Sequence, residues 1–212
     1  MKLNRFKNKI NFKNITLLRY FIIFALLFSN KIYSVDWLIT SSGNYKLGYD
    51  ITSSGDSNGT IRIRSSYVNL DLNGFFLKQT TSTAGCIGIV VDPGLTNITI
   101  KNGTITNYTT TGLSVGANCS TVLVKDMVVQ YCTQTGTSGA GLSVGAGCNN
   151  IFLDNILTVS CTVDGIDFNG TSNNNIVDCV IRNCSIVGCS TDASNCILLN
   201  NCARVKVMNA IL

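Results

Sequence analysis

The sequence predicts an all-β protein, a parallel β-helix (solenoid) of about six to seven coils, each roughly 22–30 residues long. Three observations predict it. Segments repeat along the chain, apolar and polar residues alternate inside short segments, and Gly, Asn and Asp separate those segments. The composition agrees, because Asn, Thr, Ser and Gly occur 25, 22, 19 and 19 times in 212 residues whereas Glu is absent, which disfavours helices.

Residues 1–34 are predicted to be a secretory signal peptide. They carry seven basic side chains and no acidic one, and the basic start leads into an apolar run at residues 20–28 and then to Ser34, a small residue suited to cleavage. An uncleaved N-terminal anchor is the alternative, although this run is short for a membrane span. In either case we expect the remaining chain to be secreted, periplasmic or at the cell surface, with a membrane contact only through an uncleaved N-terminal segment.

Residues 35–212 are predicted to form one β-helix domain. They hold 9 basic and 11 acidic side chains, so no basic excess remains to bind a phosphate backbone, and nucleic acid is disfavoured as a partner. The chain ends at residues 207–212 in apolar residues without a polar cap. The domain is therefore expected to be incomplete or uncapped there, with further coils or a protein partner covering this end.

The clearest repeat is residues 112–119, which recur almost unchanged as residues 141–148. Residues 88–95 match the first copy one repeat earlier, and residues 165–172 match the second copy one repeat later. Segments of a second kind lie between them, at residues 97–102, 121–126, 150–155 and 174–179. A unit this short buries no core alone, but copies stacked about 4.8 Å apart bury a continuous column of side chains.

Alignment of these units predicts which side chains stack. One predicted column lies at the end of a strand, where stacked amides can hydrogen-bond: Asn102, Asp126, Asn155, Cys179 and Asn209. A second predicted column points outward: Lys101, Lys125, Asp154 and Asp178. The ten cysteines fall mostly at coil-related positions, such as Cys119 and Cys148, and are expected to be small apolar core residues, although export allows disulfides among them.

Three segments carry a resemblance to a known family: residues 43–52, residues 61–63 and residues 69–74. Over residues 40–212 the chain resembles the single-stranded right-handed parallel β-helix proteins of the pectate-lyase-like superfamily, and these segments are similar to the first coils of exported bacterial repeat proteins. The resemblance implies the fold but not one activity. Similar scaffolds serve pectate lyases, polygalacturonases, epimerases, phage tailspikes and adhesins.

Asp164 and Asp167 are candidate catalytic residues, because the segment Asp164-Gly-Ile-Asp167 resembles the start of the polygalacturonase signature. Paired carboxylates suit glycoside hydrolysis, one as acid and the other as base or nucleophile. The Asn-Thr that leads this signature is Thr162-Val163 here, and the family's Gly-His-Gly is impossible in a chain without histidine. The alternative is a structural Asp-Gly turn that leads into an inward Ile166.

Asp154 and Asp178 are candidate metal ligands. The predicted outward column makes them neighbours about 5 Å apart, where two carboxylates share a cation such as Ca²⁺ or a proton. Arg182, four residues after Asp178, is the candidate base of a lyase. The alternative is a solvent-exposed ladder in which Lys125 relieves the repulsion. No other cofactor is expected, and Ca²⁺ only if the protein is a lyase.

The predicted function is that of an exported, non-catalytic β-helix with a structural, adhesive or glycan-contacting role. The absence of His and Glu and the incomplete catalytic signature favour it. The alternative is a polysaccharide lyase or glycoside hydrolase that acts on an acidic polysaccharide, which the aspartate pairs favour. A polysaccharide or cell-surface glycan is the expected partner.

Overall fold

The computed structural model describes residues 37–54, 58–133, 140–188 and 195–212, so the predicted signal peptide at residues 1–34 lies outside the described residues. Every helix or strand assigned in those ranges is a β-strand, which confirms the all-β prediction. Within the same ranges, no helix has the length and apolar character that a membrane crossing requires.

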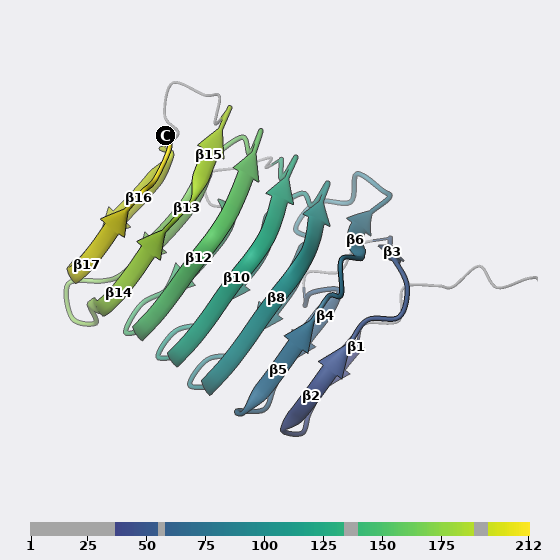
Figure 1. The fold of residues 1–212 in the computed structure, drawn as a ribbon, viewed down its shortest axis with the longest axis horizontal. Helices are drawn as coiled ribbons and strands as arrows, with labels where there is room; N and C mark the ends of the chain where they lie inside the picture. Colours follow the sequence, from purple (N-terminus) through teal and green to yellow (C-terminus); the bar gives the residue numbers. More distant parts are fainter. Residues whose placement is uncertain (1–36, 55–57, 134–139, 189–194) are drawn as a thin grey trace, which may run out of the picture. The chain divides into compact units, whose positions relative to one another are not determined.

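Two parallel sheets contain most of the described strands (Figure 1). Sheet A runs, in spatial order, β1 (Trp37–Ile39), β4 (Ile61–Ile63), β7 (Ile87–Val91), β9 (Thr111–Val115), β11 (Ala140–Gly145), β13 (Asp164–Asn169) and β16 (Ile197–Asn200). Sheet B runs β2 (Gly43–Lys46), β5 (Val68–Asp71), β8 (Thr96–Thr106), β10 (Ser120–Gln130), β12 (Asn149–Val159), β14 (Ile176–Arg182) and β17 (Cys202–Met208). Three further short strands belong to sheet B but lie off this order: β3 (Ile51–Ser53), β6 (Phe76–Gln79) and β15 (Ser185–Val187). Since each coil gives strands to both sheets, the chain forms a parallel β-solenoid of about 6 turns.

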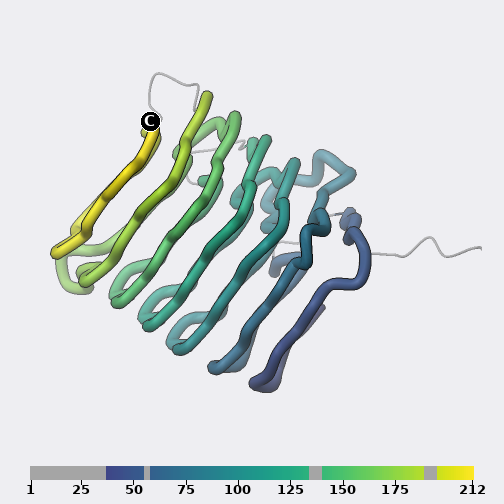
Figure 2. Tube along the Cα trace, in the orientation of Figure 1, coloured from purple at the N-terminus to yellow at the C-terminus, as the bar shows by residue number. Residues whose placement is uncertain are grey.

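The register confirms the coil stacking that the repeats predict. Val122 of β10 pairs with Ile98 of β8 on one side and with Ile151 of β12 on the other. The backbone nitrogen of Asn149 donates to the Cys119 carbonyl oxygen at 3.0 Å, so Cys119 and Cys148 occupy the same position in successive coils. Figure 2 shows the trace of each coil running alongside the next.

The core is a stack of aliphatic side chains between the sheets. Ile100, Val124, Leu153 and Ile181 follow one another in the register of sheet B and are fully buried. Each such side chain stabilises the fold by roughly 1.5–3 kcal/mol when it leaves water. Of the nine cysteines that the structure describes, seven are buried and all are free thiols, in agreement with their expected role in the core.

Left-handed backbone marks the corners of the coils. One corner column has φ between 51° and 62° throughout: Asn102, Asp126, Asn155, Asn183 and Asn209. Asn155 Nδ2 donates to Asp126 Oδ1 at 2.9 Å, so side-chain amides also bridge neighbouring coils. Asn and Asp tolerate this conformation better than other residues with a Cβ atom, which explains part of the asparagine content.

One long turn makes the spacing between paired residues differ between the two sheets. In sheet A, Leu142 of β11 pairs with Ile166 of β13, and in sheet B, Asn149 of β12 pairs with Val177 of β14. The chain between the paired residues is therefore longer in sheet B than in sheet A. The difference lies in the turn after β13, which contains an isolated antiparallel bridge between Thr171 and Asn174.

Because of this longer turn, two of the predicted neighbours are wrong. Asn183, and not Cys179, follows Asn155 in the corner column, because Asp154 pairs with Arg182. Arg182 therefore also takes the place beside Asp154 that the repeat pattern predicts for Asp178. An alignment with a constant repeat length does not account for the extra residues in the turn.

Candidate functional site

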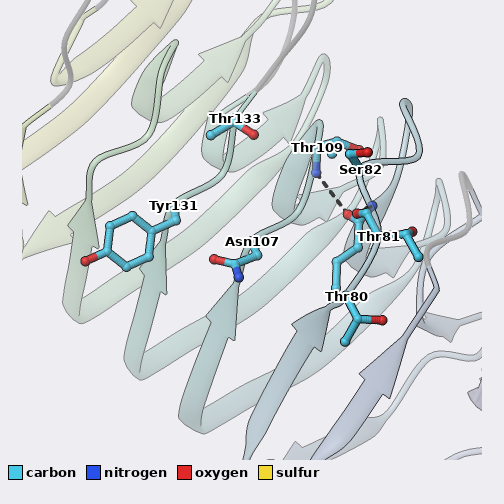
Figure 3. Close-up of a pocket in the computed structure, with 8 residues that line it drawn as sticks. Thr80, Thr81, Ser82, Asn107, Thr109, Tyr131 and Thr133 are labelled. Atoms are coloured by element: carbon cyan, nitrogen blue, oxygen red, sulfur yellow. Dashed lines mark hydrogen bonds between the residues drawn. The ribbon is translucent and has the colours of Figure 1, made fainter.

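A polar hollow, which we name the hydroxyl pocket, lies just beyond the C-terminal ends of β6, β8 and β10 (Figure 3). Its volume is about 330 Å³, within the range of about 300–1,000 Å³ that is usual for small-molecule sites. The lining residues are Gln79, Thr80, Thr81, Ser82, Asn107, Thr109, Tyr131 and Thr133. All eight side chains are uncharged.

Coil stacking places Asn107 and Tyr131 next to each other. β8 and β10 pair through Thr106 and Gln130, so the residues that follow occupy equivalent positions in successive coils. Both have left-handed backbone, with φ of 65° at Asn107 and 53° at Tyr131. The Tyr131 side chain remains 49% exposed, although it is a large aromatic residue.

Gln79 forms a fixed wall of the pocket. It is 2% exposed, and its amide nitrogen donates to the carbonyl oxygens of Thr81 at 2.8 Å and Thr83 at 3.1 Å. Its side-chain oxygen, Oε1, accepts from the Thr109 backbone amide at 3.0 Å, the dashed contact in Figure 3. The side chain therefore shapes the pocket and has little hydrogen-bonding capacity left for a ligand.

Other pocket groups remain available. Within the described part of the chain, no hydrogen bond engages Ser82 Oγ, Thr133 Oγ1, the Tyr131 hydroxyl or the side-chain nitrogen Nδ2 of Asn107. By contrast, Thr80 Oγ1 donates to the Ser53 carbonyl at 3.0 Å. An exposed aromatic ring beside several unengaged neutral polar groups can bind a molecule that has both an apolar face and hydroxyl groups.

A second hollow of about 430 Å³ lies near the start of β8 and β10. Its lining residues are Asn97, Ile98, Thr99, Thr121, Val122, Leu123 and Phe152. Phe152 is 43% exposed. This hollow is lined mainly by apolar and threonine side chains on the outer face of sheet B.

The structure places the predicted catalytic residues Asp164 and Asp167 on β13 in different surroundings. Asp164 is buried, and its Oδ1 accepts hydrogen bonds from the backbone nitrogen of Asn195 at 2.7 Å and from its Nδ2 at 3.2 Å. Asp167 lies between Ser143 and Leu198 of the adjacent coils, and its buried Oδ1 has no partner among the described residues. Burial, and then the charge of Asp164, raises the pKa of Asp167 to about 6.

The predicted metal ligands Asp154 and Asp178 are not paired with each other. Asp154 Oδ2 accepts from Arg182 Nη2 at 2.8 Å, and Asp178 Oδ1 accepts from Arg204 Nε at 2.5 Å. These hydrogen bonds lower the pKa of both carboxyl groups. Arg182, the predicted base, is bound to Asp154, and its own pKa is raised by that contact. Among the residues described, no group of three or more acidic or cysteine side chains is arranged to hold a metal ion.

Comparison of the chain with known protein families, curated proteins and solved structures finds no match. Functional inference therefore depends on the geometry of the sites.

The hydroxyl pocket was missed by sequence reasoning, because its residues come from three separate coil ends. The signal present in the sequence was the Thr80–Thr83 run together with Asn107 and Tyr131, which follow aligned strands.

Proposed function

We propose that the protein is an exported, non-catalytic β-helix that contacts a glycan through the hydroxyl pocket. The observation that carries the proposal is the exposed Tyr131 ring beside Asn107, in a hollow whose lining also includes the unengaged hydroxyl groups of Ser82 and Thr133 (Figure 3). A sugar ring has an apolar C–H face and a rim of hydroxyl groups, and the pocket offers a complement to each. Export rests on the predicted signal peptide at residues 1–34.

The proposal includes the finer fold assignment, a right-handed β-helix of the pectate-lyase-like superfamily. Its support is the resemblance over residues 40–212 together with the parallel stacking of coils. Since scaffolds of this kind serve both enzymes and binding proteins, the assignment is compatible with a non-catalytic role and does not by itself require one.

A carbohydrate microarray probed with the full-length chain tests the glycan-binding role. The informative variant is Tyr131→Ala, and the matched control is Phe152→Ala, because Phe152 is comparably exposed but lies outside the hydroxyl pocket. We expect the wild type and the control to bind the same glycans, and Tyr131→Ala to lose roughly tenfold in affinity. Equal losses in both variants, or no glycan bound by the wild type, would contradict the proposal.

A glycoside hydrolase or lyase acting on an acidic polysaccharide is the second candidate, and Asp167 is the observation that favours it. Its raised pKa of about 6 suits a general acid, and Asp164 lies on the same strand. The test is incubation of the full-length chain with polygalacturonate and alginate, with and without Ca²⁺. New reducing ends, or unsaturated product, that disappear in Asp167→Asn would support this candidate over the non-catalytic one.

A further inference from the structure

We infer that the hydroxyl pocket binds neutral sugars and discriminates against anionic ones such as uronates. The inference rests on the proposed glycan-binding role and names the class of ligand. It disfavours an acidic polysaccharide as the ligand of this pocket.

The first argument is charge. None of the eight lining residues is charged. A carboxylate that leaves water loses more hydration than a neutral hydroxyl group does, and a cationic partner offsets that loss best. The described arginines are engaged elsewhere, with Arg62 and Arg64 paired to Asp92, Arg182 to Asp154, and Arg204 to Asp178. Lys78 precedes Gln79 in β6 and is exposed, but it is not among the residues that line the pocket.

The second argument is the balance of donors and acceptors. Ser82, Tyr131 and Thr133 carry hydroxyl groups, which both donate and accept, and Asn107 carries the side-chain nitrogen Nδ2, which donates. Sugar hydroxyl groups also donate and accept, so each can pair with these groups in either direction. An ionised carboxylate only accepts, and it would leave the acceptor capacity of three hydroxyl groups unused.

The third argument is that the pocket walls are fixed. Gln79 is held by three hydrogen bonds, and Thr109 Oγ1 donates to the Thr83 carbonyl at 2.5 Å. A wall fixed in this way keeps its uncharged groups in place when a ligand binds. Selectivity for neutral ligands therefore follows from the lining residues themselves.

NMR titration of the full-length chain with three matched pairs of methyl glycosides tests the inference. Each pair differs only at C6, as a hexoside against its uronide: glucoside and glucuronide, galactoside and galacturonide, mannoside and mannuronide. We expect the neutral member of at least one pair to bind roughly tenfold or more tightly than its acid. Tyr131→Ala should weaken that binding.

Two further variants sharpen the test. Thr133→Lys places a cation at the pocket and should strengthen binding of the uronide, whereas Thr99→Lys, outside the pocket, should not. If a uronide binds as tightly as its neutral partner and Tyr131→Ala abolishes that binding, the inference fails while the proposed function stands. If no member of any pair binds, both fail.

Discussion

Arg182 Nη2 donates to Asp154 Oδ2 at 2.8 Å, and the two residues are direct neighbours in the register between β12 and β14. The repeat pattern predicts Asp178 at that position instead. A carboxylate that meets a guanidinium has its charge compensated within the protein. The reason to expect a calcium ion between two stacked aspartates is therefore removed.

Asp154→Asn should lower the melting temperature slightly at pH 7 and have a smaller effect near pH 2. The hydrogen bond from Arg182 lowers the pKa of Asp154 in the folded protein. A lowered pKa stabilises the fold above the unfolded pKa of about 3.9, and this contribution is lost as the pH falls through the folded pKa. Calorimetry at both pH values checks it, and an equal difference at both would mean that the effect does not come from charge.

Asp167→Asn should have the opposite effect from Asp154→Asn and raise the melting temperature at pH 7 to 8. Burial and Asp164 raise the pKa of Asp167 to about 6, so its ionisation disfavours the folded state. The folded protein binds more protons than the unfolded chain between about pH 4 and 6, and stability from this group falls as the pH rises through that window. The two proteins should melt alike at pH 3.5. A lower melting temperature for the variant at pH 7 would show that the carboxylate is stabilised by a contact.

Thr121→Asn should stabilise the fold by about 1 kcal/mol. Thr121 has φ of 54°, a conformation that is unfavourable for a β-branched residue. The residues at the same register position in the adjacent coils, Asn97 and Asn150, are both asparagines with positive φ. Thr99→Asn is the control, since Thr99 lies on the same outer face of sheet B but is not among the residues with positive φ. Urea unfolding measures both variants, and a gain at Thr99 equal to that at Thr121 would refute the conformational explanation.

Gly112→Ala should destabilise the protein by about 1–3 kcal/mol. An added Cβ atom would overlap Val129 Cγ1 and lie 2.7 Å from the Gly141 carbonyl oxygen, and both are held in the packed interior. Gly48→Ala is the matched control, because a Cβ atom there meets no heavy atom within 4 Å. Urea unfolding should separate the two variants, and equal stabilities would show that the coils at Gly112 have room for a methyl group.

The fold could be predicted from the sequence because the sequence repeats visibly and each repeat corresponds to one coil. Residues 112–119 and 141–148 are nearly identical, and the period-two pattern within each unit identifies strands. The register beyond β12 could not be predicted in the same way. The extra residues around Thr171 and Asn174 form a polar turn, and a turn leaves no apolar pattern that would reveal its length.

The candidate sites were less predictable than the fold. Asp164 and Asp167 stand out in the sequence as a pair, but the hydrogen bonds from Asn195 to Asp164 depend on a distant segment of the chain. The hydroxyl pocket arises where irregular coil ends meet, so no single motif contains it. Thr and Ser are common throughout the chain, and only the structure distinguishes those of the pocket from the rest.

The register between β12 and β14 decides which side chains meet on the outer face of sheet B, and methyl NOE spectroscopy measures it most directly. We predict cross-peaks from the Leu153 methyl groups to those of Val124 on one side and Ile181 on the other. Cross-peaks from Leu153 to Val177 in place of Ile181 would restore the constant repeat length. That result would place Asp178 beside Asp154 and contradict the pairing of Asp154 with Arg182.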